Sequence, residues 1–133
     1  MGLGSVERSI TSRTAMLLLV AALGSSLVAC GSEERIASGF HALSGYSEYV
    51  PSQVPTGKAP LVVAIHGCSQ NASSFAASTG WNELAETYGF YVLYPDKNGG
   101  CWSNRYLGGY SQAEVNQVVG YINQMTSRHP QID

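Results

Sequence analysis

The sequence predicts an α/β fold with a mostly parallel sheet and an N-terminal hairpin, and three observations lead to this prediction. Leu61–Ile65 and Phe90–Tyr94 are short, unbroken apolar runs, which are typical of strands covered on both faces. A helical pattern over residues 72–88 separates them, and a second one over 111–128 follows. A strand, a helix and a strand at this spacing form a parallel unit with a right-handed crossover.

The first element is predicted upstream of these runs. Residues 39–50 are rich in tyrosine and end before Pro51, which suits a strand. The proline-bearing stretch 51–60 is then expected to be a hairpin turn that joins this strand to Leu61–Ile65.

The helical segments are predicted from apolar residues that recur three and four positions apart. In 72–88 this stripe comprises Trp81, Leu84, Ala85 and Tyr88. Gly80 is expected to divide that segment into two pieces. In 111–128 the shared apolar face comprises Val115, Val118, Ile122 and Met125. Ser111 and Glu114 have the spacing of a capping box at the start of this second helical segment.

Length and composition limit the protein to one globular domain. The chain has 133 residues, and domains typically run to roughly 100–150 residues. Its 44% apolar and 12% charged content is that of a folded chain and not of a disordered one. The net charge of −2 gives no reason to expect nucleic acid or an anionic membrane surface as a partner.

The N-terminus has the features of an export signal. Arg8 and Arg13 precede an apolar stretch, 16–30, that is too short and too interrupted to predict a membrane span. The last four residues of this stretch, Leu-Val-Ala-Cys, resemble a bacterial lipobox, in which Cys30 is lipidated and becomes the first residue of the mature protein. The alternative is an ordinary secretory signal with an accidental cysteine. In both cases the chain is exported to a compartment in which disulfides persist.

These features divide the chain into three parts. The predicted parts are a lipoprotein signal peptide over 1–29, a tether over 30–38 and the domain over 39–133. If Cys30 is lipidated, Cys68 and Cys101 remain as an even pair.

Cys68 and Cys101 follow the ends of two strands that should be neighbours in the sheet. We therefore favour a disulfide between them over a buried pair of free thiols. The bond would close a loop of roughly 30 residues, worth about 3–4 kcal/mol in the chain-entropy model. No histidine or cysteine spacing suits zinc, and we predict no metal and no cofactor.

His66, Gly67 and Cys68 directly follow the first apolar run. Functional residues gather at the carboxyl ends of strands in open α/β sheets. Glycine permits a sharp turn there, and such a turn can point a backbone N–H toward a developing negative charge. An imidazole can brace the loop by hydrogen bonding.

The residues that follow extend this pattern into a resemblance to a known family. Residues 66–95 read HGCSQNASSFAASTGWNELAETYGFYVLYP, and Cys101 and Trp102 come after them. This string resembles the polyhydroxybutyrate depolymerase family of esterases, and acetylxylan and feruloyl esterases are similar. The resemblance covers residues 39–133 and implies the N-terminal part of an α/β-hydrolase. In such enzymes a serine attacks an ester carbonyl, a histidine relays the proton and an aspartate orients the histidine.

The resemblance also implies roles for individual residues. Cys68 is the candidate backbone N–H donor of an oxyanion hole, and His66 is expected to support its loop. Trp102 either lines the substrate cleft or anchors a surface loop. Asp96 follows a strand end and is a possible triad acid. In the family, however, the acid and the base come after the nucleophile in chain order. Neither Asp96 nor the histidines of this chain are therefore expected to complete a triad.

The nucleophile itself is expected to be absent. In the family it lies on a G-x-S-x-G turn, after a strand that follows the helix predicted over 111–128, and the sequence reaches Asp133 before it. We therefore expect a domain truncated before the nucleophile elbow, without nucleophile, acid or base. Residues 109–113 read Gly-Tyr-Ser-Gln-Ala, but a polar segment precedes them and Ser111 is better explained as a helix cap. A truncated sheet would leave its last strand with an unpaired edge, which invites aggregation.

Two hypotheses about function result. The favoured one is an exported, lipid-anchored serine esterase that hydrolyses carboxylic esters, either polyhydroxyalkanoate or acylated polysaccharide, and that is inactive as the present chain. Its expected partners are the ester substrate and a membrane, reached through the lipid anchor only, with no nucleic acid. The alternative is a non-catalytic, truncated lipoprotein with a binding role or no function.

Overall fold

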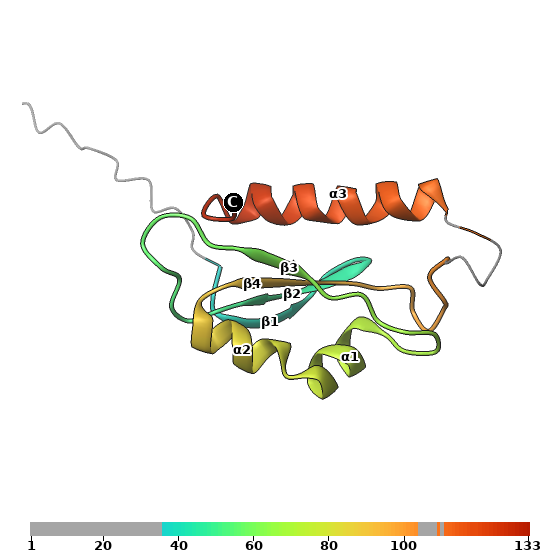
Figure 1. Cartoon of the computed structure of the whole chain (residues 1–133), viewed down its shortest axis with the longest axis horizontal. Helices are drawn as coiled ribbons and strands as arrows, with labels where there is room; N and C mark the ends of the chain where they lie inside the picture. The colour runs from blue at the N-terminus through green and yellow to red at the C-terminus, as the bar shows by residue number, and fades with distance from the viewer. Residues whose placement is uncertain (1–35, 104–108, 110) are drawn as a thin grey trace, which may run out of the picture. The chain divides into compact units, whose positions relative to one another are not determined.

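The protein is described by a computed structural model that places residues 36–103, 109 and 111–133. The chain divides into two units, Met1–Glu33 and Glu34–Asp133, and all of these residues belong to the second unit. These residues form a four-stranded sheet in the order β1-β2-β4-β3, with helices on both faces (Figure 1). The strands are β1 Gly39–Ala42, β2 Tyr46–Val50, β3 Leu61–Val63 and β4 Tyr91–Pro95. The helices are α1 Ala72–Thr79, α2 Trp81–Tyr88 and α3 Gln112–Arg128.

The sheet is mixed, and the prediction of a mostly parallel sheet is not met in the described residues. β3 pairs with β4 in parallel, as expected for the strand-helix-strand unit. β1 pairs with β2 and β2 pairs with β4, both in antiparallel register. The α/β class itself is confirmed, because the helices α1 and α2 connect the two parallel strands.

The N-terminal hairpin exists, but its predicted position was wrong. Residues 39–50 form two strands, β1 and β2, and the Leu43 N–H donates to the Tyr46 carbonyl at 2.9 Å to close the turn between them. Gly45 lies in this turn at φ 84°, and a Cβ there would collide with the Tyr121 hydroxyl of α3. Residues 51–60 are a crossing connection and not a hairpin turn, because β4 lies between β2 and β3.

The helices begin and end where local signals place them. Gly80, at φ 71°, separates α1 from α2, which confirms the predicted division. Asn71 and Ser74 form a reciprocal capping box at the start of α1. Ser111 caps α3 by accepting the Glu114 N–H at 3.4 Å. The Glu114 carboxylate bonds elsewhere, so the capping-box prediction is confirmed only for its Ser111 half.

The sheet separates two apolar clusters. The cluster toward α3 comprises Tyr46, Val50, Ala59, Tyr91, Leu93, Met125 and Ile132. The cluster toward α1 and α2 comprises Ala64, Ala72, Ala76, Ala85, Val92 and Tyr94. β4 is buried along its whole length because it lies inside the sheet with a helical layer on each face. Burial raises the pKa of Tyr94, and its hydroxyl donates to Asn82 Oδ1 at 2.7 Å.

The apolar stripes predicted for the helices are buried only in part. In α2, Ala85 is buried, whereas Leu84 and Tyr88 are exposed. In α3, Met125 is buried and Val115 is exposed. The buried contact of α1 and α2 with the sheet is made by Ala72, Ala76 and Ala85, and the partly buried Phe75 and Trp81 pack against it.

The N-terminal predictions lie outside the described residues. These are the signal peptide over 1–29, Cys30 as a lipidation site and most of the tether. In the part of the chain that the structure describes, none of the helices has the length and apolar character needed to cross a membrane.

Candidate functional site at the carboxyl ends of β3 and β4

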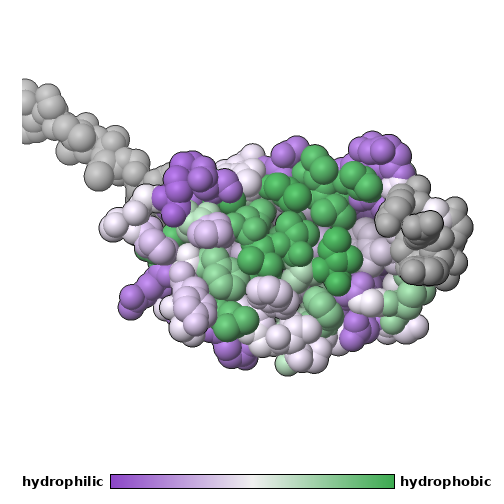
Figure 2. All heavy atoms as spheres, in the orientation of Figure 1, coloured by the Kyte–Doolittle hydropathy of each residue, from purple (hydrophilic) through white to green (hydrophobic). Residues whose placement is uncertain are grey.

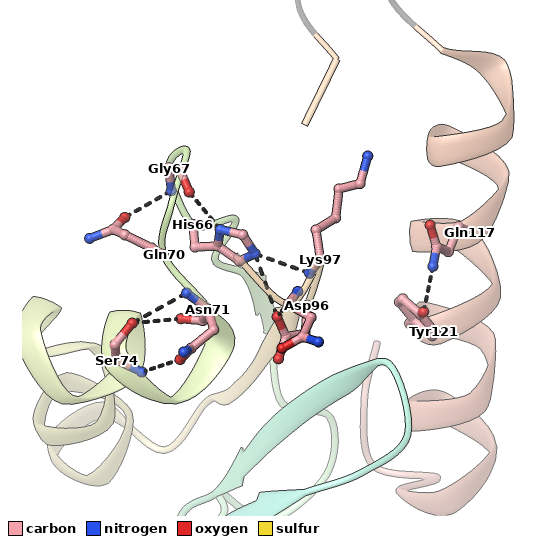
Figure 3. Close-up of polar contacts among 10 residues, drawn as sticks. His66, Gly67, Gln70, Asn71, Ser74, Asp96, Lys97, Gln117 and Tyr121 are labelled. Atoms are coloured by element: carbon pink, nitrogen blue, oxygen red, sulfur yellow. Dashed lines mark hydrogen bonds and ion pairs between the residues drawn. The ribbon is translucent and has the colours of Figure 1, made fainter. Parts of the chain in front are cut away.

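Two loops meet at one end of the sheet. His66, Gly67 and Cys68 follow β3, and Asp96 and Lys97 follow β4. Because β3 and β4 are parallel neighbours, their carboxyl ends lie side by side, and Figure 3 shows the two loops facing each other there.

His66 joins these loops through both of its ring nitrogens. Nε2 accepts the backbone N–H of Lys97 at 3.1 Å, and Nδ1 lies 2.7 Å from the carbonyl oxygen of Gly67 (Figure 3). A nitrogen that accepts a hydrogen bond carries no proton, so the network assigns the proton to Nδ1, which donates to Gly67. His66 is buried, and this brace therefore has little room to rearrange.

The loop after His66 also closes on itself. The Gly67 N–H donates to Gln70 Oε1 at 2.9 Å, and the Gln70 N–H donates to the Gly67 carbonyl at 3.3 Å. Ser69 has φ 62°, a left-handed conformation that residues other than glycine seldom adopt. For the N–H of Cys68, which is exposed, no hydrogen-bond acceptor is found among the residues that the structure describes.

Cys68 and Cys101 form a disulfide in the structure, with their Cα atoms 4.2 Å apart. The bond links the loop after β3 to the segment after β4, a sequence separation of 33 residues. Trp102 lies directly beyond it, with its ring centroid 5.8 Å from that of His66. The Lys97 ammonium lies 5.4 Å from the centroid of the Trp102 ring. The buried Trp102 Nε1 has no hydrogen-bond partner among the described residues.

An ion pair ties the segment after β4 to α3. Lys97 Nζ donates to Glu114 Oε1, and the Ser103 N–H donates to Glu114 Oε2 at 2.7 Å. The bond from Lys97, followed by the bonds from Ser103, lowers the pKa of Glu114 to about 2. The start of α3 is therefore held by a carboxylate that stays ionised over the neutral pH range.

Comparison with known proteins identifies the family to which this arrangement belongs. Residues 43–130 match the family model described as Esterase PHB depolymerase. The chain belongs to this esterase family. The resemblance predicted from residues 66–95 is therefore confirmed.

Relatives of this esterase-family chain include depolymerases and acetylxylan esterases. It is 41% identical over 73 residues to poly(3-hydroxyalkanoate) depolymerase C of Paucimonas lemoignei, a match that covers 55% of this chain and 17% of that protein. It is 38% identical over 89 residues to acetylxylan esterase A of Emericella nidulans, covering 60% of this chain and 29% of that protein. The solved acetyl xylan esterase from Aspergillus awamori shares the fold with a TM-score of 0.51 at 24% identity, covering 64% of this chain and 32% of that one. This chain spans less than a third of the length of each of these proteins.

The described part of this esterase-family chain does not bring a serine to a histidine. Ser111 accepts the Glu114 N–H as a helix cap, and its hydroxyl is not hydrogen-bonded to any described imidazole. Asp96 Oδ1 lies 3.7 Å from His66 Nε2 and accepts the Asn98 N–H at 2.7 Å. His41 contacts the Ala37 carbonyl. Among the described residues, no group of histidine, cysteine, aspartate and glutamate side chains could hold a metal ion.

The sequence reasoning missed three participants in this site. Gln70 lies in the string over residues 66–95, but nothing in the sequence indicated that its side chain accepts the Gly67 N–H. Lys97 supplies a backbone N–H to His66 from 31 positions away, a pairing that only the parallel register of β3 and β4 creates. Glu114 was interpreted as half of a capping box, and its bonds to Lys97 and Ser103 had no local signal.

Proposed function

We propose that this chain is the N-terminal part of an exported serine esterase that hydrolyses carboxylic esters, and that the Cys68 N–H is one donor of its oxyanion hole. The observation that carries this proposal is the Cys68 amide itself. It lies at the carboxyl end of β3, in an exposed turn that His66 and Gln70 brace, and no described residue accepts its hydrogen. Family membership supplies the reaction class.

The braced turn suits a reaction in which negative charge develops on an ester oxygen. When a serine attacks an ester carbonyl, the oxygen becomes an oxyanion, and fixed N–H donors stabilise it without reorganisation. His66 and Gln70 bond to the carbonyl and the N–H of Gly67, which leaves the next amide along the chain for the substrate. In enzymes of this kind, loss of one such donor costs about 3–4 kcal/mol of transition-state stabilisation.

The remaining machinery is proposed to lie outside this chain. The described residues provide neither nucleophile nor acid nor base in a triad arrangement, so we expect the chain to be inactive by itself. The relatives, a poly(3-hydroxyalkanoate) depolymerase and an acetylxylan esterase, favour polyhydroxyalkanoate or acetylated xylan as the substrate class. Trp102 is proposed to line the cleft, and the Cys68–Cys101 disulfide to hold the oxyanion loop. Cys30 is proposed to be the lipid anchor of the exported protein.

A chimera tests the role of the Cys68 amide. Residues 39–133 replace the corresponding segment of acetylxylan esterase A of Emericella nidulans, and kcat is measured on p-nitrophenyl acetate. Cys68→Pro removes the N–H, and we expect kcat to fall by roughly 100- to 1,000-fold. Cys68→Ala is the matched control, since it also breaks the disulfide but keeps the N–H. Equal kcat in the two variants would refute the assignment.

The unmodified chain tests the absence of a nucleophile. Incubated with p-nitrophenyl acetate, it should give no turnover above background. Turnover that a serine-directed phosphonate abolishes would show that a nucleophile is present after all.

A non-catalytic lipoprotein is the second candidate, favoured by the lack of a serine–histidine contact in the described residues. The nucleotides after the Asp133 codon discriminate between the two candidates. A strand-forming stretch followed by G-x-S-x-G in any frame supports the esterase, and its absence supports the non-catalytic protein.

A further inference from the structure

A shallow hollow of about 250 Å³ lies at the end of the sheet opposite to the candidate functional site. It is lined by residues 53–55, which precede β3, and by residues 86–89, which precede β4. The hollow is therefore at the amino ends of these parallel strands, whereas Cys68 follows the carboxyl end of β3. In Figure 1 the connection 51–60 and the end of α2 lie on the left, and the loop after β3 lies on the right. The five residues of β4 separate the two ends by roughly 16 Å.

Glu86 places a fixed carboxylate in this hollow. Its Oε2 accepts the Ser52 N–H at 3.0 Å and the Tyr49 hydroxyl at 3.1 Å, and its Oε1 accepts the Ser52 hydroxyl. The bonds from the side chain and then the backbone of Ser52 lower the pKa of Glu86, so it is ionised at neutral pH. A carboxylate has about four lone-pair sites, and three bonds leave one acceptor position for a ligand. Because the side chain is already held, binding costs it little rotamer freedom.

Tyr88 offers an open aromatic surface beside this carboxylate. It lines the hollow and is 70% exposed, and Leu84, 43% exposed, lies one helical turn before it on the same side of α2. Pro55 lies against Gly89, where a Cβ would come within 2.6 Å of the proline ring. The face of an aromatic ring is electronegative and attracts C–H groups that carry partial positive charge.

These groups suit a neutral sugar ring better than a polyester. A pyranose has a face of C–H groups for the Tyr88 ring, and hydroxyls that can donate to Glu86 and bond to the Gln53 amide. The ester carbonyls of a polyhydroxyalkanoate only accept hydrogen bonds, so they offer nothing to an ionised carboxylate. An anionic polysaccharide would be repelled by Glu86 and by Glu83 on the same helix.

The surroundings of the hollow are also polar. Figure 2, drawn from the same side as Figure 1, shows mostly purple and pale residues at this end of the molecule. The apolar residues, in green, gather across the middle of the face instead. A ligand rich in hydroxyls therefore fits this end of the molecule better than an apolar one.

We propose that this hollow binds a neutral polysaccharide, with a sugar ring stacked on Tyr88 and its hydroxyls bonded to Glu86 and Gln53. The hollow holds the polymer at a distance from the Cys68 turn. It favours acetylated xylan over polyhydroxyalkanoate as the substrate of the whole enzyme. That choice of substrate rests on the proposed esterase function, whereas the binding itself needs no catalysis.

Titration of the isotope-labelled full chain with xylohexaose, followed by nuclear magnetic resonance of the backbone amides, tests the proposal. We expect the Thr87 and Gly89 amides to shift and those of Gly67 and Cys68 to stay unchanged. Tyr88→Ala should weaken binding about fivefold or more. Tyr88→Phe, the matched control, keeps the ring and should bind as the parent does. Because the Tyr88 side chain is mostly exposed, both variants should fold. Equal affinities of the parent and Tyr88→Ala would overturn the proposal.

Two further ligands test the choice of occupant. A trimer of 3-hydroxybutyrate should leave the Thr87 and Gly89 amides unchanged. A proline-rich peptide is the competing occupant, since such peptides dock on aromatic-lined grooves. Tighter binding of the trimer or of the peptide than of xylohexaose at these amides would overturn the proposal. Shifts confined to Gly67 and Cys68 would assign the sugar to the candidate functional site and would also overturn it.

The result can be separated from that of the esterase chimera. If xylohexaose binds in the hollow but the Cys68→Pro and Cys68→Ala chimeras have equal kcat, only the oxyanion assignment fails. If the chimeras differ in kcat but xylohexaose leaves the Thr87 and Gly89 amides unchanged, only the polysaccharide site fails.

Discussion

Glu48 of β2 and His129 at the end of α3 meet in the interior, with Glu48 Oε1 3.2 Å from His129 Nε2. The Glu48 side chain has no exposed area, and Arg128 lies 3.0 Å from the same oxygen. The other carboxylate oxygen, Oε2, is buried and has no partner among the described residues. Burial, followed by the charge of Glu48, raises the pKa of the neighbouring Tyr91. A buried carboxylate therefore fastens the end of α3 to the sheet.

Removal of this carboxylate should destabilise the fold. Glu48→Ala leaves His129 and part of Arg128 without their buried partner, and we expect a loss of about 2–4 kcal/mol in the free energy of unfolding. Urea denaturation followed by circular dichroism measures it. Glu83→Ala, on the exposed side of α2, is the control and should stay within about 0.5 kcal/mol of the parent. A loss no larger than that of the control would show that the cluster contributes nothing.

The Glu114 contacts predict an acid-sensitive anchor for α3. The bonds from Lys97 and then Ser103 lower the pKa of Glu114 from 4.5 to about 2. For an acid whose pKa is lowered in the folded state, the stabilisation is present above the unfolded pKa and is lost as the pH falls through the folded pKa. The melting temperature of the parent protein should therefore fall as the pH is lowered from 4.5 to about 2. The melting temperature of Glu114→Gln should fall less steeply over the same pH range. Parallel curves of melting temperature against pH for the parent and for Glu114→Gln would contradict this prediction. Glu83→Gln is the control for the loss of a carboxylate.

The Cys68–Cys101 bond predicts a stability that depends on redox state. It spans a sequence separation of 33 residues, so its loss should cost up to about 3–4 kcal/mol. Urea denaturation with and without dithiothreitol measures this loss. The Cys68→Ser/Cys101→Ser double variant should be insensitive to the reductant. Alkylation of both cysteines in the untreated protein, detected by mass spectrometry, would show that the disulfide is absent in solution.

Gly45 and Gly57 form a matched pair for testing the turn beneath α3. Both have positive φ, 84° and 108°, but a Cβ at Gly45 collides with the Tyr121 ring, whereas nothing lies within 4 Å of one at Gly57. Alanine at either position should cost about 1–3 kcal/mol for backbone strain. Gly45→Ala should lose roughly 1 kcal/mol more than Gly57→Ala because of the collision. Thermal unfolding measures both, and equal losses would show that Tyr121 moves aside freely.

Local chemistry made several elements predictable. Gly80 divides α1 from α2 because a left-handed residue ends one helix, and Ser111 starts α3 because its hydroxyl accepts a free N–H. The apolar run at Phe90–Tyr94 indicated a buried strand, and β4 is that strand with a shift of one residue. These signals act over a few residues, so the sequence carries them without knowledge of the fold.

The misplaced hairpin turn and the overlooked Glu48 have a different origin, because both depend on pairing between distant segments. The hairpin turn was placed at 51–60 because prolines favour turns, yet β4 inserts between β2 and β3 and leaves that stretch as a connection. Glu48 drew no prediction at all, because an acidic residue in a strand is usually exposed. Its partner lies 81 positions away, and only the docking of α3 brings the two together.

The sequence by itself determined the α/β class, the family through the string over 66–95, and the position of the candidate oxyanion amide after the first apolar run. Tertiary structure alone decided which groups meet there. Lys97 reaches His66 because two parallel strands end side by side, and Ile132 reaches Ala59 because α3 crosses back over the sheet. Propensities and caps depend on neighbours a few residues apart, whereas pairing between distant segments depends on which strand order buries the most apolar surface.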